Sequence, residues 1–161
     1  YPSVFALLPP PLVGRGLQCV GRLDQDTTGL LLFSDDGQFI HRMISPKKRV
    51  AKVYRAICAE AVTDAMLAAL RGGVQLNDEP GPIVALACEK LHEHVLRLTL
   101  AEGKYHQVRR MIAAAGNHVE ALHREAIGNY ALPADLPPGA WRWLETDDLK
   151  QLEQPWPSAM S

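Results

Sequence analysis

The sequence predicts an α+β fold in which hairpin strands and helices follow one another without a regular strand–helix–strand alternation. Three runs, at residues 50–58, 83–91 and 95–100, have the length and the β-branched or alternating apolar content of strands. The last two runs are separated only by a short polar turn, which indicates a hairpin. Apolar residues with helical spacing follow at 105–115, and a Gly-Asn pair ends that pattern.

The first third of the chain is predicted to contain a loop, two strands and one helix. Residues 1–16 are rich in Pro and Gly, which is typical of a loop or tether. A short strand is expected at 17–23, and the continuous apolar run at 30–33 indicates a buried central strand. Asp35 or Asp36 can then cap a helix that ends before a proline.

Helices and strands are expected in irregular order along the rest of the chain. Thr63 can cap a helix whose apolar residues recur at helical spacing, and Gly72-Gly73 would end it. Residues 119–132 are predicted to be largely extended, and an acidic helix is expected at 146–152. These elements complete the mixed α+β pattern.

The composition is that of one globular domain. Of the 161 residues, 47% are apolar and 22% are charged, which is sufficient for a hydrophobic core. We expect a tether at 1–16, the folded domain at 17–152 and a tail at 153–161. The three cysteines are odd in number and widely spaced, so they predict reduced thiols in a cytosolic protein. His92 and His94 have no nearby ligand partners in the sequence, so no metal site is predicted. No stretch is long and apolar enough to span a bilayer, so no membrane span is predicted.

The charge distribution indicates a basic face, although the formal net charge is −1. From residue 42 to residue 55 the chain has six Lys or Arg and no acid. From residue 104 to residue 124 it has four Lys or Arg and three His against the single acid Glu120. Two basic segments could form a positive surface that contacts phosphates, and ordinary solvated charge is the alternative.

Three segments contain side chains suited to chemistry. Asp24 follows a predicted strand, so its carboxylate can project into a cleft, although the motif alone is better explained as a turn. Arg109 or Arg110, on a predicted helix, can form a bidentate pair with a carboxylate and keep it ionised, or can simply face solvent. Tyr54 can stack on a nucleobase or pack in the core.

Taken together, four ordered segments resemble the RsuA/RluB/RluE/RluF group of bacterial ribosomal RNA pseudouridine synthases. The run Gly-Arg-Leu-Asp-x-Asp-Thr-x-Gly-Leu-Leu-Leu at 21–32 is similar to the signature around the group's catalytic aspartate. Lys52-Val53-Tyr54, the run Glu-Gly-Lys-Tyr-His-Gln-Val-Arg-Arg-Met at 102–111 and Leu122-His123-Arg124 follow in the group's order. The resemblance covers nearly the whole chain. Its Tyr-His-Gln segment looks most like the RsuA branch, which modifies 16S ribosomal RNA.

The resemblance implies a pseudouridine synthase catalytic fold with a mixed, largely antiparallel central sheet flanked by helices. It implies that Asp24 attacks C1′ of a flipped uridine, or assists formation of a glycal, without a cofactor. Arg109 or Arg110 would pair with Asp24, and some RsuA proteins have Lys at the position of Arg109. Tyr54 would stack on the uracil. The implied substrate-binding residues are Leu122 and a set of cations: Arg22, Lys47, Lys48, Arg49, Lys52 and Arg124.

The resemblance also implies a partner. We expect a monomeric cytoplasmic enzyme that acts on 16S ribosomal RNA or on a small-subunit assembly intermediate. Two alternatives stay open: the same reaction on 23S ribosomal RNA, and a non-catalytic RNA-binding fragment. The group's small N-terminal S4-like RNA-binding domain and its first catalytic-domain strand are expected to be missing from this chain.

Overall fold

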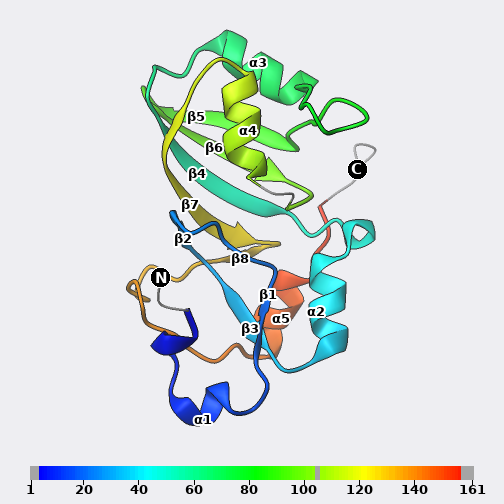
Figure 1. The fold of residues 1–161 in the computed structure, drawn as a ribbon, viewed down its shortest axis with the longest axis vertical. Coiled ribbons are helices and arrows are strands. Elements are labelled where there is room, and N and C mark those ends of the chain that lie inside the picture. The colour runs from blue at the N-terminus through cyan, green and yellow to red at the C-terminus, as the bar shows by residue number, and fades with distance from the viewer. Residues whose placement is uncertain (1–3, 104–105, 157–161) are drawn as a thin grey trace.

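The computed structural model describes residues 4–103 and 106–156. Figure 1 shows two parts stacked along the long axis of the molecule. The upper part is a large sheet with two helices, and the lower part is a smaller group of strands and helices. Strand β2 (Thr27–Gly29), from the N-terminal third of the chain, pairs with β7 (Val119–Ile127) of the large sheet and so joins the two parts.

The large sheet has six strands in the order β2-β7-β4-β6-β5, with β8 added to β7. Every pair is antiparallel except β2 with β7, so the expectation of a mixed, largely antiparallel sheet is confirmed. The remaining strands are β4 (Lys52–Cys58), β5 (Ala87–His92), β6 (Val95–Leu100) and β8 (Tyr130–Ala131).

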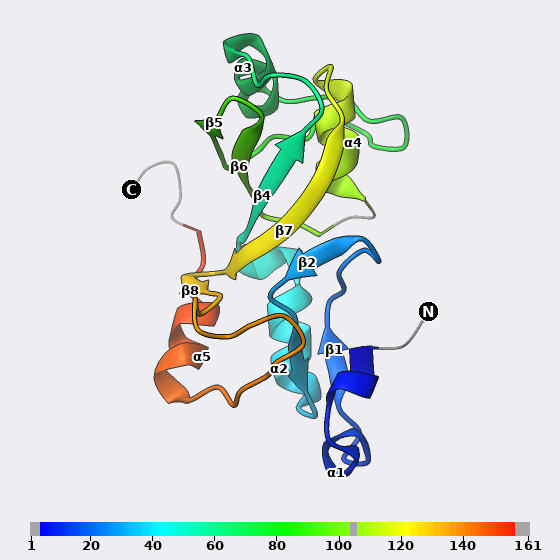
Figure 2. The ribbon, with the colours of Figure 1, turned by 90° about the vertical axis from the view of Figure 1, so that its left-hand side faces the viewer.

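Helices α3 (Asp64–Gly72) and α4 (Gln107–Ala114) cover one face of this sheet (Figures 1 and 2). Thr63 caps α3 as predicted, because its hydroxyl accepts a hydrogen bond from a backbone N–H of the first turn. The predicted helix start at Tyr105 lies outside the described residues. The fully buried side chains of this first core include Leu70, Leu96, Leu98, Leu100, Met111 and Ile112.

The lower part has its own core. Strand β1 (Gln18–Val20) pairs antiparallel with β3 (Leu32–Ser34), and α2 (Gly37–Ile44) and α5 (Thr146–Leu152) pack against them. Asp36 is the cap of α2, because its carboxylate accepts two backbone N–H bonds from the first turn. None of the described helices is both long and apolar enough to cross a membrane.

The apolar run at 30–33 does not form the central strand that was expected. Strand β3 begins only at Leu32, and it belongs to the two-stranded sheet with β1. Leu30 and Leu32 are nevertheless buried, because the second core covers them. A continuous apolar run therefore predicts correctly that the segment is buried, but it does not indicate whether strands or helices cover it.

Two other predicted elements also differ. The described part of the segment 1–16 is not all loop, since it contains a short 3-10 helix η1 (Val4–Leu7) and helix α1 (Pro10–Val13). Proline at the start of α1 is compatible with a helical first turn. The strand expected at 83–91 begins only at Ala87, where continuous pairing with β6 begins.

Strand β2 is not predicted from the sequence, because its two threonines are part of a polar run. It forms because Gly29 has a φ of 113° and brings its backbone against that of Arg124, where a Cβ would overlap the Arg124 main chain. This parallel pairing fixes the preceding loop, residues 21–26, beside β7. The chemistry predicted for that loop depends on this close approach.

Candidate active site

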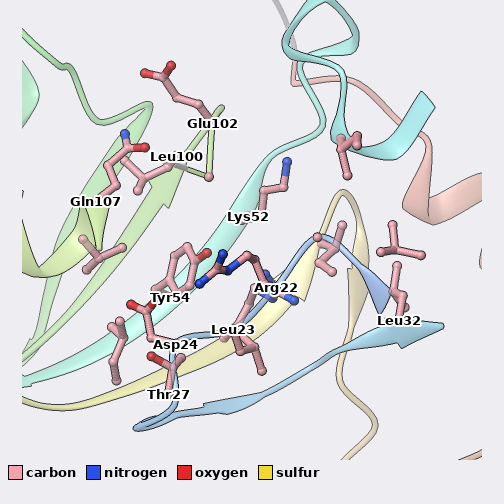
Figure 3. Close-up of a pocket in the computed structure, with 18 of the residues that line it drawn as sticks. Arg22, Leu23, Asp24, Thr27, Leu32, Lys52, Tyr54, Leu100, Glu102 and Gln107 are labelled. Carbon is pink, nitrogen blue, oxygen red and sulfur yellow. The ribbon is translucent and has the colours of Figure 1, made fainter. Parts of the chain in front are cut away.

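A cavity of about 350 Å³ lies where the two parts of the fold meet. Its walls come from the β1–β2 loop, β4, β7, α2, the end of β6 and the start of α4. Figure 3 shows Arg22, Asp24, Lys52 and Tyr54 around the same space. Residues that are far apart in the sequence are therefore brought together here.

Asp24 is held at the cavity by a short turned loop. Gly21 has a φ of 73°, which a glycine adopts without strain, and the Thr27 N–H donates to the Asp24 carbonyl at 2.9 Å. The Asp24 side chain is 20% exposed. Its carboxylate is thus anchored through the backbone while it stays accessible from the cavity.

Among the described residues, the side chain in contact with the Asp24 carboxylate is that of His106, and the contact is an ion pair when the imidazole is protonated. Its Nε2 lies 3.5 Å from Oδ1 of Asp24, a longer contact than an ordinary hydrogen bond. His106 directly precedes α4 and has a φ of 47°, which is uncommon for a residue other than glycine. Backbone strain of this kind is concentrated at functional sites. Sequence reasoning missed this contact; the only signal was the position of His106 inside the run at 102–111.

The expected pairing of Asp24 with Arg109 or Arg110 is not formed in the described part of the chain. Nη2 of Arg109 lies 3.2 Å from Oδ1 of Asp26, and Arg110 contacts the carboxylate of Asp78. The reason is helical geometry: consecutive side chains on α4 point about 100° apart, so the two arginines reach different segments. Arg109 still contacts the loop that holds Asp24, but at its more exposed end.

Tyr54 and Leu122 line the cavity beside Asp24. Both side chains are buried and also belong to the first core. The alternatives that the sequence left open for Tyr54, core packing or a place in a binding site, are therefore not exclusive. Its position on β4, opposite Arg124 on β7, presents it to the cavity.

The predicted cations divide into two sets. Arg22, Lys52 and Arg124 line the cavity. Lys47, Lys48 and Arg49 are exposed outside it, before β4 begins. Only the first set is in a position to contact a molecule inside the cavity, and the second set could contact only what extends beyond it.

Burial in the cavity wall and, second, the nearby charge of Arg124 together lower the pKa of Lys52 to about 8. Burial has the opposite effect on the Cys88 thiol, whose pKa it raises to about 11. The three cysteines are free thiols, as predicted. Within the described residues, no three His, Cys, Asp or Glu side chains are grouped as metal ligands.

Comparisons with known proteins show the family to which a chain with this fold and cavity belongs. The model of the RNA pseudouridylate synthase family matches residues 4–114, more than half of the chain, so the chain belongs to this family. The solved structure "Crystal structure of pseudouridylate synthase" has a TM-score of 0.90 and 42% sequence identity, covering 94% of this chain and 66% of that one. The family and the fold expected from the resemblance are confirmed.

Curated relatives are named "Ribosomal small subunit pseudouridine synthase A". The protein of Escherichia coli strain K12 is 43% identical over 149 residues, which cover 92% of this chain and 64% of the relative. The protein of Haemophilus influenzae is 41% identical over 152 residues, covering 94% and 65% respectively. The chain thus spans just under two thirds of the length of these relatives. A 17% identical H/ACA ribonucleoprotein chain, with a TM-score of 0.53, shares the fold over 71% of this chain.

Proposed function

We propose that the protein isomerises a uridine to pseudouridine in 16S ribosomal RNA. The observation that carries the proposal is the placement of Asp24 in a cavity with Tyr54 and Leu122, in a chain of this family. The 16S assignment is supported by the relatives, whose names describe them as pseudouridine synthases of the ribosomal small subunit. We expect the protein to act as a monomer in the cytoplasm, on free RNA or on an assembly intermediate.

The reaction exchanges one bond to the ribose for another. The N1–C1′ bond of uridine breaks, the uracil turns over, and C5 bonds to C1′. The C5 proton is lost and N1 gains a proton, so the product is an isomer and no oxidant or added group is required. Asp24 would attack C1′, or would remove a ribose proton on a route through a glycal. Tyr54 or a water molecule would accept the C5 proton.

The target base has to leave its stack before it can reach Asp24. Flipping costs about a few kcal/mol, and least where the nucleotide is already unpaired. The Tyr54 ring and the Leu122 side chain, both on the cavity wall, would compensate by packing against the flipped uracil. The exposed Lys47, Lys48 and Arg49 would contact RNA phosphates outside the cavity.

Arg109 is proposed as a positioning residue rather than as the direct partner of Asp24. Its ion pair with Asp26 would hold the loop in which Asp24 lies. His106 would place a donor near the Asp24 carboxylate. Arg110 contacts Asp78 and has no role in this proposal.

The test is to incubate the protein with unmodified 16S and 23S ribosomal RNA and to map pseudouridine chemically. We expect one modified site in 16S RNA and none with an Asp24→Asn variant. Product on 23S RNA alone would contradict the substrate assignment. Absence of product on both RNAs, by protein that remains folded, would favour a non-catalytic RNA-binding role.

A further inference from the structure

Arg124 has a buried guanidinium that the protein satisfies only in part. The residue is 4% exposed, and its Nε donates to the Leu30 carbonyl at 2.9 Å. The Leu30 N–H in turn donates to the Arg124 carbonyl at 3.0 Å, so the two residues are fixed to each other. Nη2 of Arg124 is buried and has no hydrogen-bond acceptor among the described residues. An unsatisfied buried donor is costly, which makes an acceptor from a ligand favourable.

Lys52 lies on the same cavity wall and is also without an acidic partner in the described structure. It is two positions before Tyr54 on β4, so both side chains point to the cavity side of the strand. Its lowered pKa reflects loss of water and the proximity of Arg124. Two cations in a partly desolvated site repel each other. An anion bound between them would relieve this repulsion, so the site favours anion binding.

Besides Arg124, the charged groups around Lys52 in the cavity come from two segments. Arg22 and Asp24 are on the β1–β2 loop, and Glu102 follows β6. Tyr54 is the titratable neighbour on its own strand, and α2 contributes only Met43 and Ile44 to the cavity. Asp24 is in contact with His106 rather than with Lys52. Lys52 and Arg124 thus line the same cavity as Asp24 and Glu102, but no ion pair joins them to either carboxylate in the described structure.

We propose that Lys52 and Arg124 together bind one backbone phosphate of the RNA, beside the uridine that enters the cavity. This inference rests on the proposed function. A phosphodiester has a single negative charge and two free oxygens, which match one ammonium and one guanidinium N–H. Lys52 and Tyr54 are about 7 Å apart along the strand, a separation comparable to that of a base and a phosphate of one nucleotide.

The first experiment measures anion binding directly, without turnover. Protein with ¹³C-labelled lysine is titrated with uridine 5′-monophosphate, uridine 3′-monophosphate, inorganic phosphate and uridine, and the Lys52 signal is assigned from its loss in Lys52→Arg. We expect the phosphate-containing probes to raise the pKa of Lys52, and uridine to leave it unchanged. The affinity for the monophosphates should fall as the pH rises through about 8, because the free site then loses its proton. An equal response to uridine would overturn the proposal.

The second experiment identifies the phosphate in RNA. A uridine-containing oligonucleotide is made with a neutral methylphosphonate on either side of the uridine, and its affinity is measured for wild type and Lys52→Met. One of the two substitutions should weaken wild-type binding by about tenfold, and it should have little further effect on Lys52→Met. If neither substitution matters while free phosphate binds, the site takes free phosphate and the RNA assignment is wrong.

Matched variants separate charge from packing. Lys52→Arg should keep affinity for the RNA within about threefold and should remove the loss of affinity above pH 8. Lys90→Met, which removes an exposed lysine of β5, should change neither property. Arg124→Lys retains a cation and tests the second half of the site if Arg124→Met does not fold. Lys52→Met should also reduce the slope of the logarithm of RNA affinity against the logarithm of salt concentration by about the amount expected for one phosphate contact.

The two proposals can fail separately. If pseudouridine forms but the methylphosphonates and Lys52→Met have no effect on affinity, the phosphate site is refuted and the enzymatic function stands. If no pseudouridine forms in either ribosomal RNA but the pKa of Lys52 responds to phosphate, the anion site stands and the function is refuted.

Discussion

The two faces of the large sheet carry their charged residues in contrasting ways. On the face away from α3 and α4, Arg97 of β6 contacts Glu89 at 2.8 Å and Glu125 at 3.3 Å. The hydrogen bonds that Arg97 donates to Glu89 and, second, to Glu125 raise the pKa of Arg97. Thr28 and His123 are also joined on this face at 2.8 Å, across β2 and β7.

On the cavity face, the same sheet presents two cations without acidic partners among the described residues, one on β4 and one on β7. Lys52 of β4 has a lowered pKa, and Arg124 of β7 keeps a buried nitrogen without an acceptor. Charges that the protein pairs internally stabilise the pairing of strands, whereas charges left without a partner are available to a ligand. The alternation of side chains along a strand allows one sheet to do both.

The largest expected effect comes from the carboxylate that lies at the cationic cavity. Asp24→Asn should lower the single-turnover rate of pseudouridine formation by about 10³-fold or more, because it removes the proposed nucleophile but little packing. RNA affinity, measured by filter binding, should stay within about threefold of wild type. Asp35→Asn, an exposed aspartate before α2, is the matched control and should be fully active. A rate above one tenth of wild type for Asp24→Asn would contradict the assignment.

The parallel pairing of β2 with β7, which joins the two parts of the fold, is the next target. Gly29→Ala should lower the free energy of unfolding by about 3 kcal/mol, because its φ is positive and the new Cβ would overlap the Arg124 backbone. Chemical denaturation measures this change. Gly37→Ala, where a Cβ meets nothing within 4 Å, should be neutral or slightly stabilising. Equal stability of the two variants would show that β2 does not depend on close approach at Gly29.

The partly buried ammonium of Lys52 on the cavity face predicts a specific pH dependence of stability. The unfolded chain holds the Lys52 proton up to a pKa of about 10.5, whereas the folded protein loses it near pH 8. Between these values the unfolded state binds more protons, so the free energy of unfolding should rise with pH, by about 2–3 kcal/mol in total. The measurement is the difference between wild type and Lys52→Met from pH 7 to pH 10.5. A difference that does not change with pH would mean that Lys52 is solvated.

The smallest effect is expected from the paired face. A double-mutant cycle between Arg97→Ala and Glu125→Ala should give a coupling of about 0.5 kcal/mol, because both side chains are partly solvated. High salt should reduce this coupling. A coupling above about 2 kcal/mol would place the pair among buried ion pairs and weaken the contrast between the two faces.

Much of the fold could be predicted because local signals agreed with the final structure. Thr63 and Asp36 cap the helices that follow them, and the hairpin of β5 and β6 lies close to its expected place. Strand β2 could not be predicted, because it depends on a backbone contact between Gly29 and Arg124, residues that are distant in the sequence. Tertiary pairing of this kind leaves no periodic pattern.

The site shows the same division. Asp24, Tyr54 and Leu122 were selected from the sequence, and they do line one cavity. The side chain that contacts Asp24 could not be predicted, because the direction in which each residue of α4 points depends on how the helix is rotated about its axis. His106, in a left-handed conformation just before α4, reaches the carboxylate, while Arg109 and Arg110 reach other acids. The resemblance implies one substrate-binding set that includes Lys47, Lys48 and Arg49, and it cannot show that these three lie outside the cavity.

The most direct test of the contrast between the faces compares Lys52→Met with Arg97→Met at pH 7. The free energy of unfolding and the affinity for RNA are measured for both variants. Lys52→Met should bind RNA about tenfold more weakly and be at least as stable as wild type, whereas Arg97→Met should be slightly less stable and bind RNA normally. If Arg97→Met loses as much RNA affinity as Lys52→Met, or if Lys52→Met weakens binding only by unfolding, the cavity cations have no special role in binding.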